Sequence, residues 1–510
     1  MNIPSYLDLS NLKDLFPKDF GPGDVARAQT IFLKRLSLAA HAFYGGKMMT
    51  VPKAGIYGFG WFGVWYTPGV SAVSTAIRDN NLRSYELSNR SNLVAIVSDS
   101  TRVLGDGDCT PSGGLGVMEG KAFLMYYLGG ISAVSLCINT HADPEAHTAG
   151  FQFQPKARHE HSAQKAIDFV RMAAPSFGAV NLEDISQPNC FKVLDDLQDC
   201  GIPVWHDDAQ GTACVTLAGM INAIKLAGKD WRKVKAVFHG AGASNATIIR
   251  LLLAEGLDPR NVIAFDSKGA LHAGRDDVKA DPRFYRKWQI CQATNPQRVE
   301  DIQQACKGAD ILCSLSTPGP DVVKKAWISA MADKAIVFVC ANPVPEIYPH
   351  EAKEAGAFIV ATGRSDFPNQ VNNSMCFPGL LKGCLLVHAS RVTDTMAIAA
   401  AHSLARAQQL RGLDPDHIMP TMDDVEVFPR EAADVAAQAI QDGVAQRVMT
   451  PDEVFQTADR DIKEAREISQ LLMEREKIKT PPKEMIDTVL TETIAEIRGH
   501  IEAVKGSEHE

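Results

Sequence analysis

The feature that most constrains this chain is a succession of strand, turn and helix signals between residues 235 and 266. Residues 235–239 (KAVFH) have the apolar character of a short buried strand. Residues 246–255 have the pattern of a helix, and residues 261–265 have that of a second strand. Glycines and small residues fill the turn (Gly240, Ala241, Gly242, Ala243), and Asp266 directly follows the second strand. This order is typical of a dinucleotide-binding unit, in which helix N–H groups hold the pyrophosphate and the acid accepts from a ribose hydroxyl.

Asn245 departs from this pattern, because it stands where a glycine or alanine normally lets the helix pack closely on the strand. A turn that no longer binds a dinucleotide well therefore remains an alternative. If the site is intact, Asp266 favours NAD, with NADP possible.

Further strand-like segments continue the alternation with helices after residue 266. They are residues 311–315, 335–340 and 358–361, and Asn342 lies just beyond the second of them. This alternation predicts an α/β fold with a Rossmann-like, doubly wound parallel sheet. Ligands of such sheets bind at the carboxyl ends of the strands.

Two pairs of acids follow two other short apolar segments. Glu183 and Asp184 come after residues 179–182, and Asp207 and Asp208 come after residues 202–206. Carboxylates at the ends of neighbouring strands repel one another unless a cation joins them, and oxygen ligands suit Mg²⁺ or Mn²⁺. Taken alone, the residues leave a metal site and a simple helix cap for Asp207 and Asp208 equally open.

Three polar residues stand beside other predicted elements. Tyr66 precedes a turn signal (TPG), Arg102 follows a buried strand at residues 92–99, and Lys121 lies in the first turns of a helix at residues 117–127. Arg102 would hold a carboxylate through its planar guanidinium, and Lys121 would act as a base if a metal ion lowered its pKa. The ordinary alternatives are that Tyr66 is a core tyrosine, that Arg102 forms a surface ion pair and that Lys121 is solvated.

Composition excludes several classes of protein. The net charge of -9 gives no electrostatic footprint for nucleic acid, and no apolar run approaches a membrane span. The 11 cysteines form no CxxC pair and no secretory signal is visible, so we expect a cytoplasmic protein with reduced thiols. The histidine-rich stretch at residues 141–165 is predicted to be an exposed loop or linker rather than a metal site.

Taken together, these segments resemble the malic enzyme family. The matching stretches run in family order over roughly residues 60–405, and such an ordered set is far more specific than one motif. They are YTPGV from Tyr66, SDSTRVLG from Ser98, VMEGKA from Val117, NLEDI from Asn181, HDDAQGTA from His206, GAGA from Gly240, ANPVPEI from Ala341 and TGRSDFPNQVNN from Thr362.

The resemblance implies metal-dependent oxidative decarboxylation of L-malate, or a close 2-hydroxy acid, to pyruvate and CO₂ with NAD(P)⁺. Its implied metal ligands for Mg²⁺ or Mn²⁺ are Glu183, Asp184 and Asp208. Lys121 would take the hydroxyl proton, Asp207 would tune Lys121, and Tyr66 would protonate the enol carbon. The implied substrate ligands are Arg102, Asn342 and Asn373, and the implied dinucleotide ligands are Gly240, Gly242, Ala243, Asp266 and Asn342.

Four residues depart from the family's pattern: Ser100, Asp106, His239 and Asn245. Asp106 would repel an anionic substrate unless it is paired. The departures motivate a second hypothesis, in which the same site carries out malolactic-type or other lyase or dehydrogenase chemistry on a different hydroxy acid. A third hypothesis, a non-catalytic binding or regulatory protein, is disfavoured because the whole set of implied catalytic residues is present.

The 510 residues are too many for one hydrophobic core and predict about three domains. We expect an N-terminal substrate, metal and catalytic domain of α/β type at residues 1–225, a Rossmann NAD-binding domain at residues 226–390, and a helical C-terminal segment at residues 391–510. The expected partners are a small-molecule hydroxy acid and further copies of the chain in a homodimer or homotetramer, with no nucleic acid and no membrane.

Overall fold

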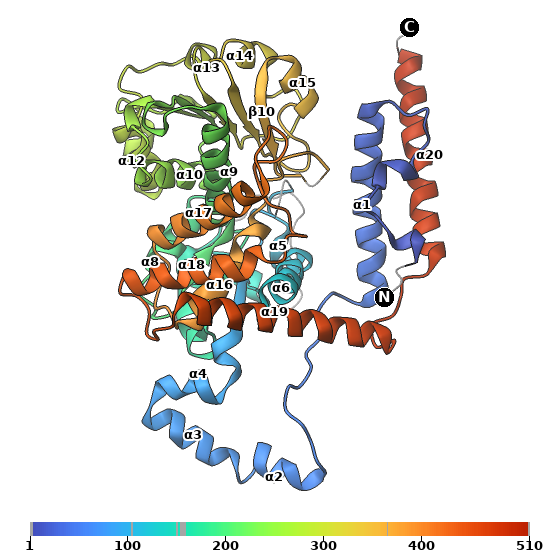
Figure 1. Cartoon of the computed structure of the whole chain (residues 1–510), viewed down its shortest axis with the longest axis vertical. Helices are drawn as coiled ribbons and strands as arrows, with labels where there is room; N and C mark the ends of the chain where they lie inside the picture. Colours follow the sequence, from blue (N-terminus) through green and yellow to red (C-terminus); the bar gives the residue numbers. More distant parts are fainter. Residues whose placement is uncertain (1–3, 104–105, 149–150, 153–159, 365, 508–510) are drawn as a thin grey trace. The chain divides into compact units, whose positions relative to one another are not determined.

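The computed structural model describes residues 4–103, 106–148, 151–152, 160–364 and 366–507 of the chain (Figure 1). The chain forms two compact units. One unit comprises residues 51–463, and the other joins residues 1–50 to residues 464–510. The division into residues 1–225, 226–390 and 391–510 stays a prediction.

The larger unit contains a parallel four-stranded sheet with the order β2-β1-β3-β4. Its strands are β1 (Leu93–Ser98), β2 (Ser132–Cys137), β3 (Ala179–Leu182) and β4 (Val204–His206). Because β1 and β3 are central and apolar, their side chains are almost fully buried. β2 was not predicted from the sequence, because it is an edge strand whose serines interrupt the apolar run.

A six-stranded sheet in the same unit has the order β10-β9-β8-β5-β6-β7. Its parallel strands are β5 (Ala236–His239), β6 (Val262–Asp266), β8 (Ile311–Ser314), β9 (Ala335–Val339) and β10 (Ala357–Thr362), and β7 (Gly269–Ala270) is antiparallel to β6. The order reverses beside β5, as in doubly wound folds. The predicted fold class is therefore confirmed: Rossmann-like parallel strands, a second α/β sheet and a helical C-terminal region.

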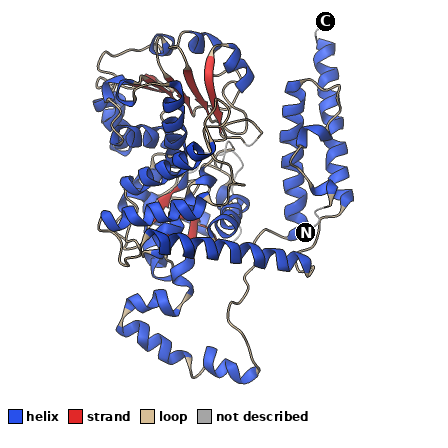
Figure 2. Cartoon of the chain, viewed as in Figure 1, coloured by secondary structure: helices blue, strands red, loops and turns tan. Residues whose placement is uncertain are grey.

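Helices flank both sheets (Figure 2). Those before the six-stranded sheet are α2 (Phe62–Trp65), α3 (Val70–Asp79), α4 (Ser84–Leu87), α5 (Thr110–Gly113), α6 (Leu115–Gly129), α7 (Ala163–Ala173), α8 (Asn189–Asp196) and α9 (Thr212–Ala227). Those within it are α10 (Ala243–Ala254), α11 (Asp276–Ala280), α12 (Tyr285–Ala293), α13 (Ile302–Cys306), α14 (Lys325–Ser329) and α15 (Pro349–Glu354). Those after it are α16 (Phe377–Leu386), α17 (Asp394–Arg411), α18 (Val427–Gln441) and α19 (Pro451–Glu474), which continues into the second unit.

The second unit pairs the two ends of the chain. Helix α1 (Pro22–Tyr44) packs against α20 (Lys483–Ser507), and both carry side chains of one apolar cluster that includes Phe32 and Ile497. Each helix has one apolar side, so each needs a partner to bury it. None of the described helices has the length and apolar character needed to cross a lipid bilayer.

The expected exposed loop at residues 141–165 holds for most of residues 142–148, which are exposed, but not for the histidines near its two ends. His141 is buried and forms a bridge with His161, whose ring nitrogen Nδ1 lies 2.9 Å from Thr140 Oγ1. The Thr140 hydroxyl also donates to buried Asp99 at 3.1 Å, so the polar side chains satisfy one another inside the fold. His159 lies outside the described residues.

Breaking a buried ion pair should weaken the larger unit. Lys382 of α16 is 1% exposed, and its Nζ lies 2.8 Å from Asp461 Oδ2 on α19. Asp461→Asn would leave the ammonium buried without its counter-charge, so we expect the free energy of unfolding to fall by about 3 kcal/mol. The matched control is Asp459→Asn on the same helix, because Asp459 pairs with an exposed lysine and should matter little. The stability of both variants is measured by urea unfolding. Equal unfolding midpoints for Asp461→Asn and Asp459→Asn would contradict the prediction.

A buried glutamate should make stability depend on pH. Burial raises the pKa of Glu431 on α18 well above its ordinary value of 4.5, and the nearby Cys214 thiol acts in the same direction. At pH values above 4.5 the unfolded chain has lost the proton of this carboxyl group, whereas the folded chain retains it. Raising the pH therefore lowers the free energy of unfolding. We expect Glu431→Gln to be more stable than the wild type at about pH 8 and to lose this advantage towards about pH 5.

The measurement is urea unfolding at several pH values, with exposed Glu426→Gln as the control. A stability difference between Glu431→Gln and the wild type that does not change with pH would refute the assignment.

Candidate active site

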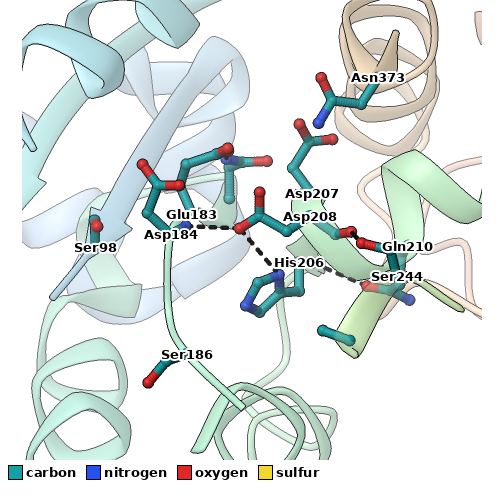
Figure 3. A network of polar contacts seen from close by, with 12 residues as sticks. Ser98, Glu183, Asp184, Ser186, His206, Asp207, Asp208, Gln210, Ser244 and Asn373 are labelled. Carbon is teal, nitrogen blue, oxygen red and sulfur yellow. Dashed lines mark hydrogen bonds and ion pairs between the residues drawn. The ribbon is translucent and has the colours of Figure 1, made fainter. Parts of the chain in front are cut away.

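The carboxylates of the two acidic segments meet at the carboxyl ends of β3 and β4. These strands are parallel neighbours with Leu182 opposite His206, so the residues that follow them are brought together. Carboxylate oxygens of Glu183, Asp184 and Asp208 all lie within 4.8 Å of one another. Figure 3 shows the three side chains gathered at one point.

Local backbone geometry places these oxygens. Asp184 has a positive φ of 54°, and its N–H donates to Asp208 Oδ2 at 2.8 Å. Asp207 and Asp208 lie in η8 (Asp207–Gly211), a π-helical turn that joins β4 to α9. Strained residues and π-turns are common where function requires an unusual side-chain direction.

The donor set suits a hard divalent cation. Glu183 is 2% exposed, and burial raises its pKa well above the ordinary value, opposed by Lys121 and assisted by Asp208. Three carboxylates so close together repel one another, and a cation between them would offset that repulsion. Oxygen ligands without sulfur or imidazole match Mg²⁺ or Mn²⁺.

Lys121 lies beside this cluster on α6. Its ammonium forms an ion pair with Asp207, lies 3.1 Å from Glu183 Oε1 and donates to Asn373 Oδ1 at 3.3 Å. Burial favours the neutral amine, but Asp207, Glu183 and Asp208 outweigh burial and raise the pKa of Lys121. These three carboxylates therefore favour the protonated amine, and the lowered pKa that we expect beside a bound metal ion stays a prediction.

A cavity of about 590 Å³ connects this cluster to the six-stranded sheet. On the side of the four-stranded sheet, its lining includes Arg102, Lys121, Glu183 and Asp208. On the side of the six-stranded sheet, it includes Gly242, Ala243, Ser244, Asn342 and Asn373. The residues predicted to hold metal, substrate and dinucleotide are thus largely brought to one space. It is large enough for a small ligand beside part of a larger one.

The glycine turn after β5 has the expected geometry. Gly240 has φ of 94°, and a Cβ there would lie 2.5 Å from the Leu315 carbonyl oxygen, so glycine is required. Asn245, the departure from the pattern, is fully buried and donates from Nδ2 to the carbonyls of His239 (3.2 Å) and Gly240 (2.8 Å). Asn245 therefore fastens the turn to the helix instead of preventing close packing.

Asp266 lies at the end of β6 but is not free. Arg275 binds its carboxylate through two nitrogens at 3.0 and 3.1 Å, and Lys287 binds it at 3.1 Å. Asp266 is not among the described residues that line the cavity. A ribose would therefore meet a carboxylate already paired with two cations.

Other sequence-predicted residues are also missing from the described cavity lining. Asp184, Asp207 and Gly240 are among them, although the first two lie in the acidic segments at the carboxyl ends of β3 and β4. Tyr66 is 70% exposed and is likewise absent from the described lining. Asp106 is exposed and also absent from the described lining, so the structure gives no sign of the expected repulsion of substrate. Ser100 has φ of 59°, which accounts for the glycine that the family usually has there.

Two residues that the sequence did not single out, Glu346 and Ser244, position this site. Buried Glu346 accepts from Ser316 N–H at 2.9 Å and from Ala341 N–H at 3.0 Å, so it ties together the loops after β8 and β9. Ser244 donates from its hydroxyl to the Asp208 carbonyl at 2.9 Å and so links the glycine turn to η8 (Figure 3). Glu346 lies in the ANPVPEI stretch, which was the available signal for it.

Comparison with known families gives two matches that together span most of the chain. Residues 60–198 match the model described as malic enzyme, N-terminal domain, and residues 209–441 match malic enzyme, NAD binding domain. A crystal structure of malic enzyme from Entamoeba histolytica is 55% identical, with a TM-score of 0.91 over 96% of this chain and 98% of that chain.

Three curated relatives are similar over most of their own lengths. The bifunctional malic/malolactic enzyme of Bacillus subtilis is 37% identical over 83% of this chain and 97% of its own. The NAD-dependent malic enzyme of Geobacillus stearothermophilus is 38% identical over 76% of this chain and 75% of its own. The NADP-dependent malic enzyme of Halomonas elongata is 36% identical over 77% of this chain and 90% of its own.

Proposed function

Because the chain belongs to the malic enzyme family of decarboxylating, NAD(P)-dependent oxidoreductases, we propose that it oxidises L-malate to pyruvate and CO₂ at this cavity. The observation that carries the proposal is the Lys121–Asp207 ion pair beside three clustered carboxylates, in a cavity that the glycine turn also lines. A base, a metal site and a dinucleotide site in one space are what this reaction needs.

Glu183, Asp184 and Asp208 would hold Mg²⁺ or Mn²⁺. A divalent cation there would polarise the C2 oxygen of malate and offset the negative charge that keeps Lys121 protonated. Lys121 would accept the proton of the C2 hydroxyl, and Asp207 would orient and tune its amine. The contact from Lys121 to Asn373 fixes the direction of the amine towards the cavity.

Arg102, Asn342 and Asn373 would bind the substrate carboxylates, since all three line the cavity. Tyr66 would donate its hydroxyl proton to C3 of the enol that remains after CO₂ leaves. The C–H bond forms as the O–H bond breaks, and water returns a proton to the tyrosinate. Unlike Arg102, Asn342 and Asn373, Tyr66 is not among the described residues that line the cavity.

The dinucleotide would bind along Gly240, Gly242, Ala243 and Asn342, with its adenosine ribose towards Asp266. The relatives include both NAD- and NADP-dependent enzymes. We propose NAD as the preferred dinucleotide, because the Asp266 carboxylate would accept from a ribose hydroxyl and repel a 2′-phosphate. The cationic side chains of Arg275 and Lys287 lie beside Asp266 and would bind a 2′-phosphate, so NADP would also serve as a cosubstrate with lower efficiency.

Asp266→Asn is expected to shift the preference towards NADP by tenfold or more, expressed as the ratio of kcat/KM values. The substitution removes the repelling carboxylate and leaves Arg275 and Lys287 available to a phosphate; a tenfold ratio corresponds to about 1.4 kcal/mol. The matched control is Asp277→Asn, because Asp277 also binds Arg275 but leaves Asp266 in place. If the ratio is the same in the wild type and in Asp266→Asn, the carboxylate has no role in dinucleotide choice.

Malolactic chemistry is the second candidate, because one relative is named a bifunctional malic/malolactic enzyme. The test incubates purified protein with Mn²⁺, L-malate and either dinucleotide, and follows reduced nicotinamide, pyruvate, lactate and CO₂. Equal amounts of reduced dinucleotide and pyruvate support the first proposal. Lactate without net reduction supports the second, and the absence of any product from malate rejects both.

A homodimer or homotetramer and a cytoplasmic location remain proposals, as does the division into catalytic, dinucleotide-binding and C-terminal parts. Exposed apolar side chains such as Tyr57 and Phe59 support self-association. The scattered, unpaired cysteines support a reducing compartment.

A further inference from the structure

His239 departs from the family's pattern and stands directly before the glycine turn. It ends β5, where the parallel register places it opposite Ser314 of β8. Its Nδ1 lies 3.1 Å from Ser314 Oγ and 3.3 Å from Ser316 Oγ. The imidazole ring also contacts the Trp327 ring edge-on, with ring centroids 5.6 Å apart. His239 therefore joins the end of β5 to β8 and to the loop that follows β8.

The buried carboxylate of Glu346 completes this network. Its Oε1 accepts from the Ser314 hydroxyl at 2.9 Å and from the Ser316 N–H at 2.9 Å, and its Oε2 accepts from a third donor, the Ala341 N–H, at 3.0 Å. Burial raises the pKa of Glu346, whereas the N–H groups of Ser316 and Ala341 oppose that shift. Because both oxygens accept backbone N–H groups, these contacts favour the carboxylate form, to which Ser314 donates its hydroxyl proton.

The position of the proton on the imidazole follows from this network. Ser314 has one hydroxyl proton, and its contact with Glu346 uses that proton, so Ser314 Oγ accepts from His239. Burial lowers the pKa of His239 and so favours the neutral ring. A neutral ring that donates from Nδ1 carries its proton there, so His239 is the Nδ1–H tautomer.

The loop after β8 forms one wall of the cavity, beside the glycine turn. Leu315 and Ser316 of this loop line the cavity, and so does Gly242 of the turn. The loop and the turn are in contact, because a Cβ at Gly240 would lie 2.5 Å from the Leu315 carbonyl oxygen. A displacement of the loop would therefore change the space over the turn, where helix N–H groups would hold the pyrophosphate.

We propose that His239 is a positioning residue for the dinucleotide: by donating from Nδ1–H to the serines that Glu346 also holds, it fixes the loop after β8 beside the glycine turn. The contacts of its ring lie on the side of the six-stranded sheet, so its effect falls on dinucleotide binding rather than on malate or metal binding. The inference rests on the proposed function for the site that the dinucleotide occupies. A merely structural role would lower stability without this selectivity.

Two substitutions of nearly equal shape test the inference. His239→Asn keeps an N–H donor at the position of Nδ1, whereas His239→Leu has no donor there. We expect His239→Leu to raise the Kd for NADH by about tenfold or more, because Ser314 and Ser316 lose the donor that fixes the loop. We expect His239→Asn to stay within about threefold of the wild type. Nicotinamide fluorescence, in the absence of malate and metal ion, measures both Kd values.

Steady-state kinetics give a second readout. His239→Leu should raise the KM for NAD⁺ by about tenfold, while the KM for L-malate stays within about twofold of the wild type. The matched control is His402→Leu, because His402 is an exposed histidine paired with Glu255 and should leave both KM values unchanged. Equal Kd values for His239→Leu and His239→Asn, or parallel increases in both KM values, would overturn the inference. A wild type that binds NADH but does not oxidise malate rejects only the proposed function.

Ser314→Ala replaces His239→Leu as the test if the latter does not fold, as judged by circular dichroism. It removes both the acceptor for His239 and the donor to Glu346, so we expect a similar rise in the Kd for NADH. Where both single variants fold, the double variant should bind NADH no more weakly than the weaker single variant, because both substitutions break one network. Additive losses of affinity in the double variant, or an unchanged Kd in Ser314→Ala, would contradict the inference.

Discussion

Lys121→Ala is expected to lower kcat by about a thousandfold while Mn²⁺ still binds. The amine is the only predicted base that contacts both Asp207 and Glu183, and without it the C2 hydroxyl has no positioned proton acceptor. Steady-state kinetics with L-malate and the preferred dinucleotide measure the loss. Because the cavity would lack only the aminoalkyl group, added methylamine should restore part of the rate in proportion to the concentration of its neutral form.

Lys192→Ala provides the matched control, because Lys192 forms an exposed ion pair within α8. We expect it to retain the wild-type rate. A variant at Lys121 that keeps most of its activity, or that methylamine does not rescue despite a native circular dichroism spectrum, would show that Lys121 has a structural role only.

Asp208→Asn is expected to weaken Mn²⁺ binding by about a hundredfold and to abolish turnover at ordinary metal concentrations. The substitution keeps the shape of the side chain but replaces one of three clustered carboxylates with a neutral amide. Titration calorimetry with Mn²⁺ in the absence of substrate measures affinity directly and so separates metal binding from catalysis.

The neighbouring Asp207→Asn is the matched control for this measurement. Asp207 is fully buried, pairs with Lys121 and is outside the group of oxygens that can share a cation. We expect it to lose turnover and to bind Mn²⁺ within about threefold of the wild type. Equal Mn²⁺ affinities for Asp208→Asn and the wild type would remove Asp208 from the proposed ligand set.

The exposed position of Tyr66 and the protonated state that the carboxylates favour for Lys121 have a common cause. Both depend on what surrounds a residue in space rather than on its neighbours in the sequence. Asp207, for example, lies 86 residues beyond Lys121. A motif identifies such residues by type and order but carries no information on charge or distance across the fold.

By itself, the amino-acid sequence determined the strands of the two sheets other than β2 and β7, the glycine turn and the acids at the ends of β3 and β4. These follow from short-range rules, because apolar periodicity and turn residues define strands, and parallel strands bring their carboxyl ends to one edge. Only the tertiary structure decided that Asn245 fastens the turn, that Arg275 and Lys287 form ion pairs with Asp266, and that α1 pairs with α20. Those outcomes arise because buried polar groups must form hydrogen bonds or ion pairs and apolar helix faces must be buried. The packing of segments that are distant in the sequence determines which residues become their partners.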